Sequence, residues 1–513
     1  MRVSLAAVAV VSIALGAASA GGTVYHVSPG GPITSLKSIV NSLAPGDVVE
    51  VASGTYNEVM KVQCNGTAAQ PITIRGVGPT RPIFDAIGQY VVGDSGSPRG
   101  VFQVEGDNII MENLAMTNAR NGNNGAGIRL LGSTNTVIRD CKISYCDMGM
   151  MGGDAAVALI EGCDVGFNGT PLYDGYSHNF YMDGSGAVIV RGCYIHDALY
   201  GQNFKSRAHY NELWYNWIAD SNEGEVGPVD SSPTSWANSN TLMVGNVVIS
   251  KPNRTGNTSK YINFGSDSGG RHNGTMYIYN NTLIAGDGRI DFISITDNYD
   301  ETQIVASNNI FLGSNDIVTY WWSSYDNHQG SYNWMGSAAN VPSNFTDTVL
   351  GTSPGFEDFG GKDFRLAAGS DCIDAGTEPL GYVDGAGVWH ELVVDESYLP
   401  GQGLVPRSAW GPIDIGAYEY VPLPPPGDAG NDGKVDGADY TIWCDNYGTT
   451  DALPWSAGGW VVGNFNEDTN VDGGDYTIWS DNYGYGTAAA VPEPATAAVL
   501  ALGLCALRRR RRE

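Results

Sequence analysis

Residues 138–143, Ile-Arg-Asp-Cys-Lys-Ile, are one copy of a hexapeptide that recurs through the middle of the chain. In each copy an apolar residue is followed by two variable positions, a Cys or Asn, another variable position and a second apolar residue. The fourth positions of the eight copies are Asn113, Cys141, Cys163, Cys193, Asn216, Asn246, Asn281 and Asn309. The intervals hold short runs with strand-like alternation, separated by Gly, Asn and Asp turns, and no helical period.

Repeats of this length are predicted to be successive coils of an all-β solenoid, a parallel β-helix, over residues 22–420. Stacking the coils pairs each short strand with its equivalents above and below and buries one continuous column. The Cys and Asn positions are expected to form an internal ladder, because Asn amides can hydrogen-bond between coils and Cys is readily buried. The alternative, chance recurrence in a β-sandwich, is disfavoured by the number of copies.

The open end of such a column needs a cap, and residues 34–43 are predicted to supply one as a short helix. Thr34 or Ser35 is the expected N-cap, and residues 44–47, Ala-Pro-Gly-Asp, end the run. The apolar face follows the helical i, i+3, i+4, i+7 spacing and consists of Leu36, Ile39, Val40 and Leu43.

This segment, together with PGDVVEVASGTYNE (residues 45–58) and PITIRG (71–76), resembles the opening of right-handed parallel β-helix polysaccharide lyases, the pectate lyase-like fold. DFRLAAGSDCIDAG (363–376) and IDIGAYEY (413–420) resemble the closing segment of many secreted β-helix proteins. The resemblance implies a right-handed solenoid. It is much less specific for activity, which must be argued from a site.

The net charge disfavours some classes of ligand, and the cysteine positions indicate whether disulfides form. Asp and Glu outnumber Lys and Arg by 55 to 27, for a net charge of −28, which argues against general binding to nucleic acid or anionic lipid. Three of the eight cysteines occupy repeat positions, so we expect mostly buried thiols rather than a disulfide framework.

Both ends carry targeting signals. Residues 1–20 have an Arg, an apolar run and Ala-Ser-Ala, the layout of a cleaved secretory signal peptide. Residues 491–513 contain Val-Pro-Glu-Pro, an apolar run and five arginines, and resemble a PEP-CTERM sorting tail. That resemblance implies export to the cell envelope or beyond, with removal of the tail by an exosortase.

The segment with the most distinctive chemistry is GQNFKSRAH, residues 201–209. Lys205 and Arg207 are two apart, so on a strand both project from one face while Phe204 and Ser206 point the other way. An ungapped count from the repeat positions places Met182 beside Lys205 and Gly184 beside Arg207.

Other polar residues of the neighbouring coils complete the predicted site. His178 is a third candidate catalytic residue. Tyr181 and Asp183 have the wrong strand parity unless a bulge intervenes. The residues predicted to contact substrate are Tyr181, Asp183, His196, Glu223 and Glu225.

Such a cluster suits β-elimination from a uronate, which needs a cation to neutralise the carboxylate, a base for the α-proton and an acid for the leaving oxygen. KSRAHYNELWYN (205–216) resembles a segment of polysaccharide lyase family 6, in which a Lys is the proposed base and an Arg assists. The resemblance implies Lys205 as base, and Arg207 is predicted to neutralise the carboxylate in place of the family's Arg. The family's Glu-x-Glu calcium ligands precede its Lys, whereas Glu223 and Glu225 follow Lys205 here, and its Arg lies one coil later.

Three alternatives remain at this stage. Lys205 and Arg207 can be a structural surface pair that binds Glu212 or Asp183. The solenoid can be a non-catalytic surface or matrix protein that binds glycans or partner proteins. Hydrolysis would need carboxylates clustered on one face, and the candidates are Asp183, Glu223, Glu225 and Asp230.

After a Pro-rich linker at residues 421–427, the chain duplicates itself: GADYTIWCDNYG (437–448) recurs as GGDYTIWSDNYG (473–484). Each helix-like run follows an acidic loop whose oxygen spacing suits Ca²⁺. The predicted ligands are Asp428, Asp432, Asp436 and Asp439 in the first loop, and Asn464, Asn466, Asp468, Asp472 and Asp475 in the second.

Residues 428–486 thus resemble a type I dockerin, a paired calcium-binding module whose partner in cellulosomal systems is a cohesin. Gly430, Asn464 and Thr469 depart from the usual loop pattern. The alternative is a solvated acidic repeat without metal.

Overall fold

A computed structural model describes residues 21–93, 96–153, 157–252, 260–286, 291–296, 301–320, 327–407, 411–455 and 458–486. The chain divides into two units between Tyr420 and Val421. The predicted signal peptide and sorting tail both lie outside the described residues.

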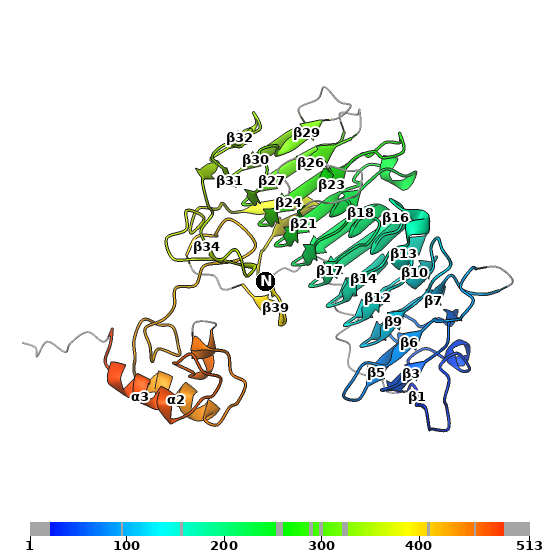
Figure 1. Cartoon of the computed structure of the whole chain (residues 1–513), viewed down its shortest axis with the longest axis horizontal. Coiled ribbons are helices and arrows are strands. Elements are labelled where there is room, and N and C mark those ends of the chain that lie inside the picture. Colours follow the sequence, from blue (N-terminus) through cyan, green and yellow to red (C-terminus); the bar gives the residue numbers. More distant parts are fainter. Residues whose placement is uncertain are drawn as a thin grey trace, which may run out of the picture. The chain divides into compact units, whose positions relative to one another are not determined.

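The first unit is a stack of coils, each with three short parallel strands, which gives the solenoid three faces (Figure 1). Two faces form one 21-stranded sheet, because the long strands β16 (Phe180–Arg191) and β18 (Phe204–Trp214) run through both. Besides these two, the first face contains β4 (Met60–Val62), β7 (Gly100–Val104), β10 (Ala126–Leu131), β13 (Met148–Gly153), β20 (Val226–Pro228), β23 (Lys260–Phe264), β26 (Asp291–Ile295) and β29 (Val318–Tyr320).

The second face shares β16 and β18 with the first. Its other strands are β1 (Val24–Val27), β2 (Val48–Ala52), β5 (Ile72–Val77), β8 (Ile109–Glu112), β11 (Thr136–Arg139), β14 (Val157–Glu161), β21 (Thr241–Val244), β24 (Thr275–Tyr279), β27 (Gln303–Ser307), β30 (His328–Ser331) and β32 (Phe345–Thr346).

The third face is a separate 12-stranded sheet. Its strands are β3 (Thr55–Tyr56), β6 (Ile83–Asp85), β9 (Ala115–Thr117), β12 (Lys142–Ser144), β15 (Asp164–Gly166), β17 (Tyr194–His196), β19 (Trp217–Ala219), β22 (Val247–Ile249), β25 (Thr282–Ile284), β28 (Ile310–Leu312), β31 (Trp334–Gly336) and β33 (Val349–Gly351). The predicted all-β parallel solenoid is therefore confirmed.

The predicted ladder lies inside the column, at the bend before the third face. Its rungs are joined by the same bond: the backbone N–H of Asn216 donates to Oδ1 of Asn246 at 2.9 Å, and that of Asn246 to Oδ1 of Asn281 at 2.9 Å. Cys141, Cys163 and Cys193 are buried free thiols on the same line, and six of the seven described cysteines are buried. Burial raises the pKa of the Cys141 and Cys163 thiols well above the usual range, so both stay protonated.

Two details of the ladder differ from the prediction. The first copy is shifted by one residue: Ala115 pairs with Lys142, which places Leu114, and not Asn113, beside Cys141. Asn113 instead occupies the preceding bend with φ of 53°, as Asp140 does with φ of 50°. The ladder also continues to Asn333, whose Oδ1 accepts from Asn309 N at 2.9 Å. The pattern missed this rung because Gly330 stands where an apolar residue was required.

The cap is only partly as predicted. Leu36 and Val40 are fully buried and Ile39 packs against the core, so the apolar face is correct. The expected helix over 34–43 is wrong in extent, since only the 3-10 turn η1 (Val40–Ser42) is regular. Ser35 accepts from Ser38 N at 3.3 Å, while its hydroxyl and the next backbone N–H donate to Glu58, so the segment is tied to the first coil.

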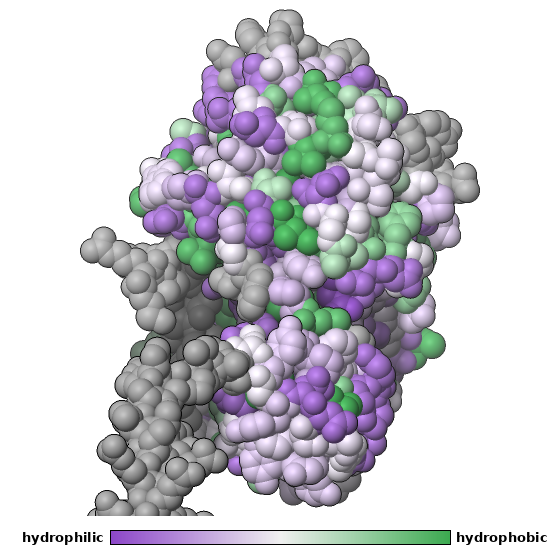
Figure 2. Space-filling model, turned by 90° about the vertical axis from the view of Figure 1, so that its left-hand side faces the viewer, coloured by the Kyte–Doolittle hydropathy of each residue, from purple (hydrophilic) through white to green (hydrophobic). Residues whose placement is uncertain are grey.

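The last part of the first unit consists of antiparallel pairs that fold back against the coils. These pairs are β34 (Phe356–Asp358) with β35 (Asp363–Leu366), β36 (Leu380–Val383) with β37 (Trp389–Leu392), and β38 (Glu396–Leu399) with β39 (Gly403–Pro406). Phe364 stacks on Trp217 of the third face, and Asp395 accepts from Tyr215 OH at 3.2 Å. In the view of Figure 2, apolar side chains form separate patches among polar ones.

The second unit contains the helices α2 (Gly437–Asn446) and α3 (Gly473–Asn482), as expected for the duplicated segment. Each begins with a capping box, formed by Asp436 with Asp439 and by Asp472 with Asp475. The two helices exchange equivalent bonds: Trp443 Nε1 donates to Asp472 O, and Trp479 Nε1 to Asp436 O, both at 2.9 Å. The duplication in sequence is therefore a duplication in structure.

Candidate functional site

The outer surface of the first face at β16, β18 and β20 brings together most of the residues predicted to be catalytic. Phe204 is fully buried in the core, so Lys205 and Arg207 project outward, as the alternation predicts. The ungapped alignment is wrong, because Tyr181 lies beside Lys205 and Asp183 beside Arg207. A bulge between Gly184 and Ala187 gives β16 one extra residue, which brings Tyr181 and Asp183 to the outer surface.

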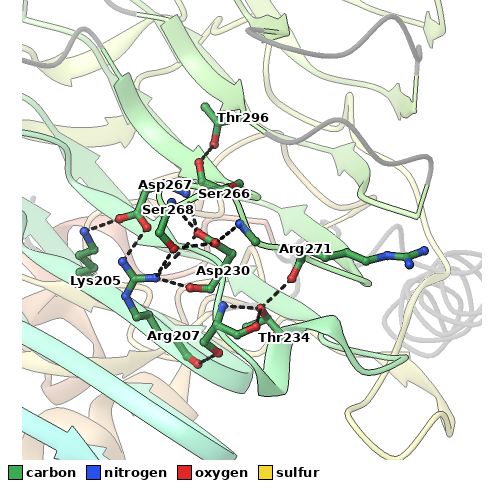
Figure 3. A network of polar contacts seen from close by, with 12 residues as sticks. Lys205, Arg207, Asp230, Thr234, Ser266, Asp267, Ser268, Arg271 and Thr296 are labelled. Atoms are coloured by element: carbon green, nitrogen blue, oxygen red, sulfur yellow. Dashed lines mark hydrogen bonds and ion pairs between the residues drawn. The ribbon is translucent and has the colours of Figure 1, made fainter.

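Lys205 and Arg207 share one carboxylate, that of Asp267 (Figure 3). Lys205 Nζ lies 2.6 Å from one oxygen of Asp267, and Arg207 Nη2 lies 2.6 Å from the other. Glu212, one of the two partners considered from the sequence, is buried and accepts from Tyr210 and Trp214 instead. Two cations around one carboxylate form a carboxylate-binding pair, occupied here by a side chain of the protein.

Asp230 holds the loop that carries Asp267. Its side chain is only 1% exposed, and it accepts from the backbone N–H groups of Asp267 and Ser268 at 2.6 and 3.1 Å. The Ser268 hydroxyl at 2.7 Å and Gly270 N at 2.5 Å donate to its other oxygen, while Arg207 donates to its backbone carbonyl. Burial acts to raise the pKa of Asp230, but these hydrogen bonds together lower it to about 2.

This depressed pKa predicts a specific acid sensitivity. Asp230 stabilises the folded state fully above its ordinary pKa of 3.8, and the contribution is lost as pH falls toward about 2. Between these pH values the wild type should lose about 2 kcal/mol of unfolding free energy more than Asp230→Asn, which cannot titrate. Urea unfolding of both proteins at a series of pH values measures this difference. A difference that does not change with pH would show that the Asp230 carboxylate is not held as described.

Tyr181 adds a phenol to the pair of cations. Its hydroxyl accepts from Arg207 Nε at 3.0 Å. Burial raises the pKa of Tyr181, and the nearby Arg207 only partly offsets this, so the phenol is a proton donor at neutral pH. The donor lies beside the two cations.

His178 lies beneath this surface rather than on it. The ring is 1% exposed and stacks on Tyr181 with ring centroids 5.7 Å apart. Nδ1 accepts from Gln202 N at 2.9 Å, so the neutral ring carries its proton on Nε2, which has no hydrogen-bond partner in the described part of the chain. Burial, then Lys205 and Arg207, lower the pKa of His178 well below its usual range. This geometry favours a supporting position under Tyr181 over contact with substrate.

The other predicted substrate-binding residues do not gather at this site. His196 belongs to the third face, where it lies between Asp164 and Asp197 at 3.1 and 2.8 Å. Glu225 is fully buried and accepts from Asn203 Nδ2 at 2.7 Å. His196 is misplaced by sequence proximity because consecutive strands of one coil face in different directions, whereas Glu225 directly precedes β20 of the first face but is buried in the interior.

The carboxylates proposed for hydrolysis are likewise dispersed. The Asp230 oxygens already accept four donors, and Glu225 is an interior residue. Glu223 is half-buried at the bend before β20, and Asp183 is the only one of the four projecting from the first face near Arg207. Asp267, the carboxylate that pairs with Lys205 and Arg207, was missed because it follows Lys205 by 62 positions in a Gly-rich turn without any recognisable motif.

The first acidic loop of the second unit has a feature that fits a cation. In the first loop Asp428 and Asp439 are 0% and 2% exposed, and both carboxylates approach Gly430. Burial and the neighbouring carboxylates Asp439 and Asp432 raise the pKa of Asp428, against hydrogen bonds from the loop. Among the described residues no three His, Cys, Asp or Glu side chains converge as a metal site. The loop carboxylates instead accept from backbone amides, such as Asp436 N to Asp439 at 2.8 Å.

Comparison with known proteins supports the fold. A family model described as a right handed beta helix region matches residues 93–242, and no curated protein matches the sequence. Among solved structures, a pectate lyase superposes with a TM-score of 0.51 at 15% identity, over 79% of this chain and 98% of that chain. A rhamnogalacturonan lyase gives a TM-score of 0.48 at 14% identity, over 61% and 87% of the two chains. A family 6 polysaccharide lyase from Pseudopedobacter saltans gives 0.40 at 15%, over 65% and 92%.

At these identities the similarity establishes the class of fold. The chain is an all-β parallel β-helix protein.

Proposed function

We propose that the protein cleaves a uronate-containing acidic polysaccharide by β-elimination on the first face of the solenoid. The observation that carries this proposal is the shared carboxylate: Lys205 and Arg207 hold the two oxygens of Asp267 at 2.6 Å each, beside the Tyr181 phenol. A uronate carboxylate has the same charge and shape as that of Asp267. The name of the similar pectate lyase is consistent with this substrate class.

The proposed reaction assigns one step to each group. The substrate carboxylate replaces Asp267 on Arg207, which neutralises it and acidifies the α-proton. Lys205 leaves Asp267, gives its ammonium proton to water and, as the neutral amine, takes the α-proton of the sugar. The electron pair forms a carbon–carbon double bond, the glycosidic carbon–oxygen bond breaks, and Tyr181 donates its proton to the leaving oxygen. The products are a shortened chain and an unsaturated uronate.

The test is an absorbance assay. The protein without residues 1–20 and 491–513 is incubated with polygalacturonate, alginate and a glycosaminoglycan, each with calcium, and ultraviolet absorbance of the unsaturated uronate is followed. We expect a rise on one polymer. Absence of a rise on every polymer, with the protein folded, would overturn the lyase proposal.

A second function is favoured by the same contact. Asp267 already neutralises Lys205 and Arg207, as expected for a surface that binds glycans without cleaving them. In that case the polymers bind to the first face and no unsaturated product appears. The assay and a binding measurement on the same samples separate the two functions.

We propose that the second unit binds Ca²⁺ through its two acidic loops, with the nine loop residues named above as ligands. The support is the buried pair Asp428 and Asp439, whose mutual repulsion a cation would relieve. The first prediction for this unit is that calorimetric titration of the full chain with Ca²⁺ detects binding. Asp428→Asn should lower the Ca²⁺ affinity of the first loop at least about tenfold, because it removes a charged ligand.

The exposed helix residue Asp445 provides the control, and Asp445→Asn should bind Ca²⁺ as the wild type does. Absence of binding heat, or an equal loss of Ca²⁺ affinity in both variants, would argue for an acidic repeat without metal.

The localisation and partners also remain proposals, supported by sequence alone. We propose export through the signal peptide, release of the tail by an exosortase, and docking of a cohesin-like partner on the second unit. Among the described residues, no helix is both long and apolar enough to cross a membrane.

A further inference from the structure

One column of outward-facing side chains runs along the first face from the proposed site toward the N-terminal coils. The strand register defines this column, because each of its residues pairs directly with the next residue on the adjacent strand. From the site outward the column is Lys205, Tyr181, Met151, Arg129, Gln103 and Lys61. Adjacent strands are about 4.8 Å apart, so Arg129 lies three strand spacings, roughly 14 Å, from Lys205.

Arg129 differs from most of the other described arginines in its surroundings. Its guanidinium has five N–H donors, yet among the described residues its one hydrogen bond is to the sulfur of Met151, at 3.0 Å from Nη1. Within the described residues it forms no ion pair, although acidic residues outnumber basic ones two to one in the chain. Burial, and then the like charge of Arg99, lower the pKa of Arg129. A half-buried arginine facing outward without an acidic partner has its donors available for an anion.

Arg99 and a nearby pocket extend the surface around Arg129. Arg99 also lacks an acidic partner among the described residues, and its Nε donates to the carbonyl of Val92 at 3.0 Å. Beyond it lies a pocket of about 410 Å³ whose lining includes Lys61, Gln63, Gln89, Tyr90 and Pro98. Lys61 belongs to the column itself, so the pocket continues the same line. Glu105, 3.9 Å from Lys61 Nζ, also accepts from Gln63 and Gln103.

We propose that Arg129, with Arg99, is a second anion-binding subsite that takes another carboxylate of the same polysaccharide, and that the chain continues from it toward the pocket. This inference rests on the proposed substrate class. A planar guanidinium binds a carboxylate through two parallel hydrogen bonds, which neither Met151 nor any other described neighbour supplies. The site would therefore select polymers with acidic groups several sugars apart.

The test measures binding without turnover. All proteins carry Lys205→Ala, so the ligand stays intact, and the probe is an octagalacturonate compared with its methyl ester, which lacks the charge. Adding Arg129→Gln should lower the affinity for the acid about tenfold, which is the value of one charge-assisted bidentate contact. The affinity for the ester should stay within about twofold of that of the Lys205→Ala protein. Arg129→Lys keeps the charge and should retain most of the binding.

Arg139→Gln is the matched control, because Arg139 is held by Glu112 and Glu161 on the second face and should not affect either ligand. Equal affinity of the acid with and without Arg129→Gln, or equal loss for acid and ester, would overturn the subsite, as would absence of any binding. Length-dependent binding of the acid without any absorbance change in the lyase assay would support the subsite while rejecting the lyase.

Discussion

Replacing Lys205 by alanine lowers the rate of uronate cleavage by a factor of about a hundred to ten thousand, because general base catalysis contributes that much. The side chain is nearly buried, with 11% exposed, and its outward direction is set by the core position of Phe204. His178 does not replace it, since its acceptor nitrogen is used for the Gln202 backbone. The measurement is kcat from the initial rise in absorbance on the polymer that responds.

Lys205→Arg separates a base from a simple cation. Arginine keeps the positive charge but cannot give up its proton near neutral pH, so this variant should bind polymer and remain as inactive as Lys205→Ala. Lys142→Ala, which breaks the ion pair to Asp164 on the third face, should keep wild-type kcat. If Lys205→Arg were fully active, Lys205 would be a binding cation and the base would have to be sought elsewhere.

The second large effect is on stability. Asn246→Leu should lower the unfolding free energy of the first unit by at least about 3 kcal/mol, because it leaves several buried polar groups unpaired. Asn246 is fully buried and connects three coils. Its Oδ1 accepts from Asn216 N and Nδ2 at 2.9 Å, and its Nδ2 donates to Leu213 O and Asn281 Oδ1 at 2.9 Å.

Asn340→Leu is the control for this variant, since Asn340 is exposed and its side chain bonds one neighbour among the described residues, Asp316. It should change the unfolding free energy by no more than about 0.5 kcal/mol. Urea unfolding followed by circular dichroism compares the three proteins. Equal stability of Asn246→Leu and wild type would mean that apolar burial alone holds the column together.

The fold was predictable from the sequence because successive coils share the same short pattern of residues. Each coil must bury an apolar residue on either side of a bend, and the Cys or Asn at the bend is part of the same pattern. The errors came where this pattern is weak. The first copy contains Leu114 at the ladder position, and the last contains Gly330 where an apolar residue was required.

The site was less predictable than the fold. Strand alternation correctly placed Lys205 and Arg207 outward, but one bulge in β16 changed which residues lie beside them. Asp267 and Arg129 could not be found from sequence, because their proximity to Lys205 depends on stacking of different coils. His196 and Glu225 were included by sequence proximity, but His196 lies on the third face and the Glu225 side chain is buried.

The most direct test of the central claim is a crystal structure of the Lys205→Ala protein with a bound octagalacturonate. The account predicts a carboxylate of the sugar chain within hydrogen-bonding distance of the Arg207 guanidinium, in place of Asp267, with the chain running along the first face toward Arg129. Sugar density confined to the second face, the third face or the second unit would contradict it.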